Sequence, residues 1–216
     1  MPSPADDVQR RRPEPPPDVV GPVAPGERPT RLIVLARPGG GKSTQAKRVA
    51  EILGVTHLSV GAMLRREVAA GSTLGRAVAL AIERGDLAAD ELVVTVVLSR
   101  VRATVAVGGY VLDGFPRNVA QAEALAEDAN REVQPQVALL LEVSVERSRR
   151  RLLARAAREG RSDDTAETIQ RRLVSYERDM MPVVERYQRA GLLVTVDGEG
   201  PADAVTSRIL ERLWLQ

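Results

Sequence analysis

The stretch Ala36-Arg37-Pro38-Gly39-Gly40-Gly41-Lys42-Ser43-Thr44 decides how the chain around it is interpreted. An apolar run, 31–35, precedes it, and 45–53 follows with apolar residues at helical spacing up to Gly54. A strand, a glycine-rich loop and a helix opening with Gly-Lys-Ser are typical of a phosphate-binding P-loop. Backbone N–H groups and the helix N-terminus attract phosphate oxygens, and Lys42 adds a cation. An ordinary helix cap would leave the glycine run unexplained, so the stretch predicts a nucleotide phosphate site.

One position departs from the P-loop pattern G-x-x-x-x-G-K-[ST], because Ala36 replaces the first glycine. If that position needs a positive φ, alanine costs on the order of 1 kcal/mol. If the position still belongs to the strand, alanine costs almost nothing. We expect the second case.

Composition limits the class of protein. The 216 residues are 44% hydrophobic but only 2% aromatic, which predicts one α/β domain with an aliphatic core. Cysteine is absent and there is one histidine, which argues against a disulfide framework, a zinc site or a histidine triad and fits a cytoplasmic location. A net charge of +2 does not favour a nucleic-acid partner, and no segment is long and apolar enough for a membrane span.

The rest of the chain divides into a proline-rich stretch, 1–29, expected to be a disordered tail, and a domain over 30–216. Strands are predicted at 31–35, 55–59, 110–113, 137–143 and 192–196. Further helices are predicted at 62–70, 74–84, 90–107, 118–131, 144–158, 165–189 and 202–213. Apolar strands alternating with helices predict a five-stranded parallel sheet between helical layers, a three-layer α/β sandwich.

A second informative stretch is Leu112-Asp113-Gly114-Phe115-Pro116-Arg117, in which an apolar strand ends at an acid and a turn presents an arginine. Ligands of such sheets gather at the carboxyl ends of the strands. Asp113 could hold Mg²⁺ through water, and Arg117 could bind phosphate oxygens. The alternative is an ordinary turn with a surface ion pair.

Arginines are dense late in the chain. Arg151 and Arg155 share a helix face, and Arg161 lies in a short polar loop. These arginines form either a solvated surface or a lid over phosphates, and composition alone does not decide between the two interpretations.

Together these residues resemble the adenylate kinases, within the nucleoside monophosphate kinases. The resemblance runs from Arg31 to the end of the chain. Its motifs, in family order and spacing, are 38–45, 57–65, 85–87, 90–93, 113–117 with Gln121, and 160–164 followed by Arg172.

The resemblance implies reversible transfer of the terminal phosphoryl group of ATP to AMP, giving two ADP. The implied ATP-binding residues are Gly39, Gly40, Gly41, Lys42, Ser43, Thr44, Arg151, Arg155 and Gly200. The implied AMP-binding residues are Val60, Arg65, Asp86, Leu87, Ala88, Gly114, Phe115, Pro116, Arg117, Gln121, Arg161 and Arg172. The implied catalytic residues are Lys42, Arg117, Arg155, Arg161 and Arg172.

The resemblance also implies Mg²⁺ bound with ATP, near Asp113 through water and near Ser43. It implies a monophosphate-binding subdomain at 59–88 and a lid at 156–164, too short for an extended lid domain or a zinc site. A monomer that binds ATP and AMP, without nucleic acid or membrane, is expected. Phosphoryl transfer needs positioning and charge neutralisation more than a general base, which suits a site of arginines and one lysine.

Two further departures keep alternatives open. Ala62 stands where the family usually has an acid, and Val60 replaces a threonine. Gln121 favours AMP, but Val60 leaves a UMP/CMP or broad-specificity kinase open, since a lost hydrogen bond weakens discrimination. Ala36 and Ala62 raise a second alternative, a catalytically weakened nucleotide-binding module. We expect AMP as the preferred acceptor, with looser selectivity and weaker Mg²⁺ dependence than usual.

Overall fold

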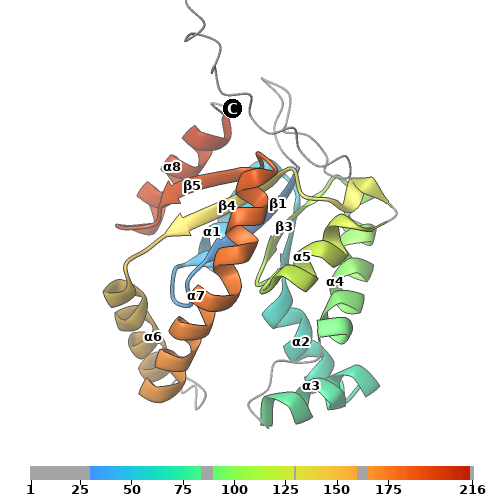
Figure 1. The fold of residues 1–216 in the computed structure, drawn as a ribbon, viewed down its shortest axis with the longest axis horizontal. Coiled ribbons are helices and arrows are strands. Elements are labelled where there is room, and N and C mark those ends of the chain that lie inside the picture. The colour runs from blue at the N-terminus through green and yellow to red at the C-terminus, as the bar shows by residue number, and fades with distance from the viewer. Residues whose placement is uncertain (1–29, 84–89, 129, 160–164, 215–216) are drawn as a thin grey trace, which may run out of the picture.

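A five-stranded, wholly parallel sheet forms the centre of the computed structural model, which describes residues 30–83, 90–128, 130–159 and 165–214 (Figure 1). The strand order is β2-β3-β1-β4-β5. The strands are β1 Arg31–Ala36, β2 Thr56–Ser59, β3 Tyr110–Asp113, β4 Val137–Glu142 and β5 Leu193–Asp197. The predicted five-stranded parallel α/β sheet is confirmed.

The central strand β1 is buried because sheet neighbours flank it on both edges and helices cover both faces. It pairs with β3 from Arg31 to Val34 and with β4 from Leu32 to Ala36. From β1 the chain crosses to the edge strand β2, returns to β3 beside β1, and then crosses to β4 and β5 on the other side of β1. This reversal of strand order places a ligand crevice at the carboxyl end of β1, where the glycine-rich loop begins.

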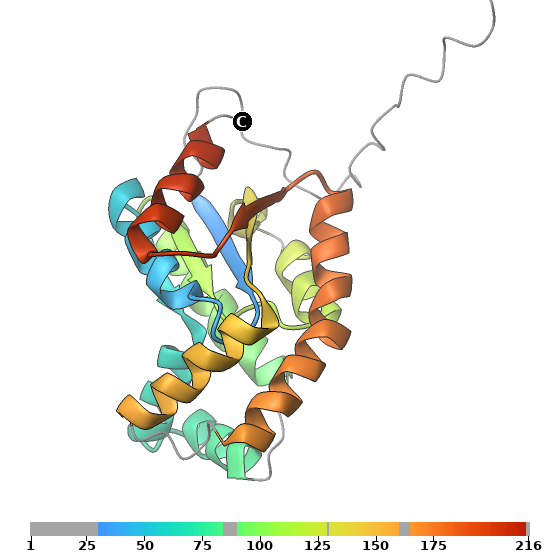
Figure 2. The same cartoon turned by 90° about the vertical axis from the view of Figure 1, so that its left-hand side faces the viewer.

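Two layers of helices cover the sheet (Figure 2). One layer comprises α1 Lys42–Leu53 and α8 Ala202–Trp214, which pack their apolar faces on the strands. The other comprises α4 Asp90–Val105, α5 Val119–Ala126 and α7 Ala166–Arg189. The core is mainly Leu, Ile, Val and Ala, as the composition predicted.

Two pairs of helices extend beyond the carboxyl end of the sheet (Figures 1 and 2). One is α2 Val60–Ala69 with α3 Thr73–Glu83. The other is α6 Val145–Glu159 with the first half of α7, joined by Leu152, Ile169 and Leu173. The carboxyl end of β1 therefore lies between two projecting pairs of helices.

The helix predicted over 118–131 is shorter than expected. α5 ends at Ala126, and a 3₁₀ turn, η1, covers Arg131–Val133. The buried carboxylate of Asp128 accepts hydrogen bonds from Arg102 of α4 and from the backbone N–H of Asn130. Such side chain–backbone bonds compete with helical hydrogen bonds. Among the helices that the structure describes, none has the length and apolarity of a membrane span.

Candidate active site

The glycine-rich loop has the tight backbone that its sequence predicts. Gly39 and Gly41 have φ values of 76° and 89°, and Gly41 is the residue before α1. A Cβ atom on Gly39 would lie 2.5 Å from the carbonyl oxygen of Ser148 in α6. Glycine at position 39 therefore lets the loop approach α6, in addition to giving the turn its conformation.

Lys42 lies folded along this loop. Its Nζ donates to the carbonyl oxygens of Ala36, at 2.6 Å, and Arg37, at 3.1 Å. The carbonyl of Arg37 also accepts a hydrogen bond from the N–H of Gly40 at 2.9 Å. The ammonium group is thus held at the mouth of the loop by backbone dipoles.

The expectation that Ala36 still belongs to the strand is confirmed. Ala36 is the last residue of β1, is 3% exposed and pairs with Leu141 of β4. No described residue other than glycine has a positive φ. A strand position has no conformational need for glycine, so alanine is accommodated here without backbone strain.

Asp113 is buried at the carboxyl end of β3 and uses both carboxylate oxygens. Ser43 donates to Oδ1 at 3.1 Å, and Nε2 of His57 lies 2.7 Å from Oδ2. The residue is 3% exposed. A carboxylate with this little access to water needs such partners, and they fix it beside the start of α1.

A pair of glycines, Gly61 and Gly114, lies next to Asp113 at the ends of β2 and β3. Gly114 has a φ of 84° and lies close to Gly61. A Cβ atom built on Gly114 would be 4.0 Å from the backbone nitrogen of Gly61. That same atom would lie 3.8 Å from Nη2 of Arg117, and a Cβ on Gly61 would lie 3.2 Å from Nη1 of Arg65. Two exposed guanidinium groups therefore lie beside this pair of glycines, an arrangement that suits an anionic ligand.

Gln121 is 3% exposed, and two neighbours hold its amide. Oε1 accepts from the backbone N–H of Arg117 at 2.8 Å, and Nε2 donates to Oδ1 of Asp90 at 2.7 Å. An amide has two N–H donors and two acceptor lone pairs. These two bonds use one donor and one acceptor, so a second donor and a second acceptor of the amide are not used by these two contacts.

Arg151 in α6 reaches the loop from the other side. A Cβ atom on Gly41 would lie 3.6 Å from its Nη1. Burial, and then the charge of Arg147, lower the pKa of Arg151. Arg147 in turn donates to the carbonyl of Gly200 at 2.9 Å, so α6 also holds the loop between β5 and α8.

The remaining predicted site residues are placed less fully. Val60 and Phe115 are each 1% exposed and pack in the core cluster of α4, α5 and α7. Arg155 belongs to α6 and Arg172 to α7. Four predicted residues lie outside the described part of the chain: Asp86, Leu87, Ala88 and Arg161.

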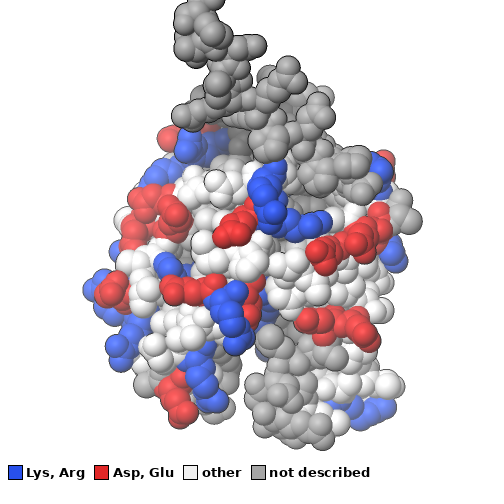
Figure 3. Space-filling view, viewed as in Figure 1, with Lys and Arg blue, Asp and Glu red and all other residues white. Residues whose placement is uncertain are grey.

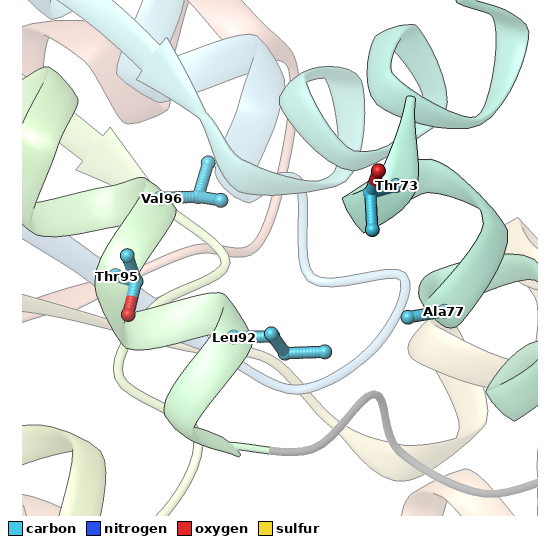
Figure 4. A pocket seen from close by; sticks show the side chains of 5 residues that line it. All are labelled: Thr73, Ala77, Leu92, Thr95 and Val96. Carbon is cyan, nitrogen blue, oxygen red and sulfur yellow. The ribbon is translucent and has the colours of Figure 1, made fainter. Parts of the chain in front are cut away.

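A cavity of about 340 Å³ separates α3 from α4 (Figure 4). Its lining is almost entirely apolar and comprises Thr73, Ala77, Leu92, Thr95 and Val96. The projecting helix α3 is therefore not closely packed against α4 at this point.

Three residues beside the site lie in the motifs of the sequence but were given no role there: His57, Asp90 and Arg37. His57 had a usable signal, because residues 57 and 59 share a face of β2 and Ser59 pairs with Asp113. That diagonal neighbourhood depends on knowing that β2 pairs with β3. The contacts of Asp90 and Arg37 join segments distant in the chain, and no local pattern predicts them.

Comparison with known proteins agrees with this geometry. The adenylate kinase family model matches residues 34–192. An adenylate kinase of Synechococcus sp. strain WH7803 is 45% identical over 181 residues, which cover 83% of this chain and 96% of that protein. An adenylate kinase of Prochlorococcus marinus strain MIT 9211 is 44% identical over 86% of this chain and 98% of its own length. An adenylate kinase of Stenotrophomonas maltophilia strain R551-3 is 41% identical over 83% of this chain and 97% of its own length. The chain therefore belongs to the adenylate kinase family, the enzymes that transfer the terminal phosphoryl group of ATP to AMP and form two molecules of ADP.

Proposed function

We propose that the loop 39–44 holds the phosphates of ATP, with Lys42 on the group that is transferred. AMP binds opposite, its phosphate between Arg65 and Arg117 and its adenine at Gln121. The observation that carries this proposal is the Gly61–Gly114 surface flanked by two guanidinium groups. Gly114 directly follows Asp113, whose carboxylate contacts Ser43 at the end of the loop, so we propose that two anions meet there.

In this arrangement the protein contributes mainly position and charge. In-line transfer needs the attacking phosphate oxygen of AMP and the terminal phosphorus of ATP to be aligned, and it needs the oxygens around that phosphorus neutralised. Lys42 and Arg117 supply fixed positive charge from opposite sides. Arg155, Arg161 and Arg172 add charge from α6, the lid and α7, and Arg151 with Gly200 holds the adenosine part of ATP.

We further propose that residues 59–88 form the AMP-binding unit and 156–164 a short lid. Both close over the nucleotides and exclude water, which would otherwise hydrolyse ATP. The cavity between α3 and α4 supports this, because the two helices are not closely packed there. Asp86, Leu87, Ala88 and the lid's Arg161 complete the two covers.

Mg²⁺ is the proposed cofactor, and the oxygen donors at Asp113 suit it. A carboxylate and the Ser43 hydroxyl lie together at the start of α1, and Mg²⁺ prefers a few such oxygens completed by water and phosphate. When bound, the ion neutralises phosphate charge. Asp113 would orient water around it, and Ser43, while donating to Asp113, still offers its oxygen lone pairs.

The proposed enzyme acts as a cytoplasmic monomer without nucleic acid or membrane partners. Acidic and basic side chains are interspersed on the face in Figure 3, which supports the absence of a nucleic-acid surface there. AMP is the preferred acceptor. Val60 offers no hydroxyl to a base, so we propose looser selectivity among monophosphates.

The test is diphosphate formation from ATP and Mg²⁺ with AMP, CMP, UMP or GMP as the acceptor. AMP should be converted fastest. Faster turnover with CMP or UMP would contradict the acceptor assignment, and no turnover with any acceptor would favour a nucleotide-binding module. Arg117→Ala should reduce turnover by about 10²-fold or more while the fold remains intact.

A further inference from the structure

Arg37, the second residue of the glycine-rich stretch, makes side-chain contacts with two distant segments. Nη1 donates to the carbonyl oxygen of Val143, just after β4, at 3.1 Å. Nη2 donates to Oε1 of Glu177 in α7 at 2.9 Å. The guanidinium carbon also lies 5.9 Å from the centre of the Tyr176 ring, within the range of a cation–π contact.

The backbone of the same residue organises the phosphate loop. Its carbonyl oxygen accepts from the N–H of Gly40, which closes the turn, and from Nζ of Lys42. Arg37 is thus the residue at which the loop's internal hydrogen bonds meet its attachment to the surrounding helices. A rotation of its peptide unit would move the acceptor that holds Lys42.

The two attachment points lead to the helices that carry the other arginines. Val143 is two residues before α6, which carries Arg151 and Arg155. Glu177 is one to two turns beyond Arg172 in α7. The planar guanidinium, with donors on separate nitrogens, suits two acceptors at once in a way that an ammonium group does not.

We infer that Arg37 is a positioning residue that fixes the phosphate loop, and with it Lys42, relative to α6 and α7. It acts through Glu177 and Val143 and does not itself bind a nucleotide. The inference rests on the proposed role of the loop in holding ATP. It adds a residue to which the phosphate-loop pattern assigns no part.

Charge effects can be separated from positioning by changing the acid instead of the arginine. Removing Arg37 also removes a positive charge near the phosphates, which weakens ATP binding by its field alone. Removing Glu177 removes a negative charge, so the field alone predicts tighter ATP binding. Positioning predicts weaker binding, and the two explanations therefore differ in sign.

The experiment compares Glu177→Ala with Asp179→Ala, the matched control two residues further along α7, whose carboxylate pairs with Arg178 instead of the loop. Affinity for a non-hydrolysable ATP analogue is measured by calorimetry, and KM and kcat are measured for both substrates. Glu177→Ala should weaken analogue binding and raise KM for ATP by about three- to fivefold, as for the loss of a partly exposed ion pair. KM for AMP should stay within about twofold, and Asp179→Ala should leave or slightly improve analogue binding.

Two arginine variants complete the test. Arg37→Ala should weaken analogue binding, and adding Glu177→Ala should weaken it no further, because both remove one attachment. Arg37→Lys should give an analogue affinity between those of the unaltered protein and Arg37→Ala. Glu177→Gln, which keeps an acceptor, should bind the analogue more tightly than Glu177→Ala does. Equal losses for ATP and AMP, unchanged analogue affinity in Glu177→Ala, or additive effects would overturn the inference. Lys42→Met separates the premises: if it also leaves analogue affinity unchanged, the role of the loop is itself wrong.

Discussion

Oδ1 of Asp90 accepts a hydrogen bond from Nε2 of Gln121 at 2.7 Å, so the first residue of α4 fixes which way the amide of α5 faces. The carboxylate can only accept, and the backbone N–H of Arg117 can only donate to Oε1. The opposite amide orientation would break both bonds. In the proposed AMP site, the second donor and acceptor of this amide would pair with adenine, which offers an N–H at position 6 and a lone pair at N1.

Asp90→Asn should therefore weaken AMP selection. An asparagine can present either its oxygen or its nitrogen to Gln121, so the amide is no longer held in one orientation. We expect KM for AMP to rise about tenfold with KM for ATP unchanged, as for one weakened buried hydrogen bond. The preference for AMP over IMP should narrow, since hypoxanthine has the reversed donor and acceptor pattern.

Steady-state kinetics with AMP and IMP check this prediction, with Glu91→Gln as the control. Glu91 is the exposed neighbour of Asp90, and the same charge is removed there. An equal change in both variants would mean that net charge, and not the orientation of Gln121, is responsible.

Ala36→Gly should leave ATP affinity unchanged and cost about 0.5–1 kcal/mol of stability. Ala36 is a buried strand residue, and glycine in a strand loses more conformational freedom on folding. The methyl group of Ala36 also lies close to Gly40: a Cβ atom built on Gly40 would be 2.8 Å from the Cβ of Ala36. Denaturant unfolding and ATP titration check both parts; ATP binding that is tighter by tenfold or more would show that position 36 requires glycine.

The sequence predicted the sheet and the phosphate loop well, because their signals are local. Runs such as 137–143 are uniformly apolar, and a P-loop pattern occupies consecutive residues. Contacts that depend on tertiary neighbours were not predicted. α5 ends early because Asp128 meets Arg102 from another helix, and His57 meets Asp113 because β2 lies beside β3. For the same reason, the motifs included both Gln121 and Asp90 but did not predict that the acid orients the amide.

His57→Leu should destabilise the protein and slow the reaction. Asp113 is nearly inaccessible to water, and the variant would leave Oδ2 without the imidazole 2.7 Å away. An unsatisfied buried acceptor costs about 1–3 kcal/mol, and Asp113 would be less firmly placed beside Ser43. His57→Gln retains a side-chain donor and should recover most of the loss. Thermal unfolding and kcat check the pair of variants; equal behaviour of Leu and Gln would contradict the role of the hydrogen bond.

Tyr110→Phe should show a stability loss that depends on pH. The phenol is fully buried and donates to the carbonyl of Val133 at 2.6 Å, and burial raises its pKa well above the usual value. The folded protein thus keeps a proton that the unfolded chain releases above about pH 10. The contribution of Tyr110 is complete below that pH and is lost as the pH rises.

At pH 7, Tyr110→Phe should lower the free energy of unfolding by about 1–2 kcal/mol, because the carbonyl of Val133 loses its donor. Above about pH 10 the difference from the unaltered protein should shrink, since phenylalanine does not titrate. Urea unfolding at pH 7, 9 and 10.5 measures this. A difference that stays constant over that range would show that Tyr110 does not stay protonated in the folded state.

Ala62→Asp should raise the rate when Mg²⁺ is limiting. Ala62 is in the first turn of α2, which follows directly after β2 and so begins beside the end of β3. A carboxylate there adds an oxygen ligand to the water shell proposed around Asp113. It also lies near the positive end of the helix, which should add about 0.3–1 kcal/mol of stability.

The control is Ala62→Asn, which has the same shape without the charge. Initial rates over a Mg²⁺ titration at fixed ATP and AMP measure the effect, and thermal unfolding without nucleotide measures the helix contribution separately. If the rates of Ala62→Asp and Ala62→Asn depend on Mg²⁺ in the same way, the missing acid at position 62 does not explain a weak dependence of the rate on the ion. A lower Mg²⁺ requirement for Asp alone places residue 62 within reach of the metal's water shell.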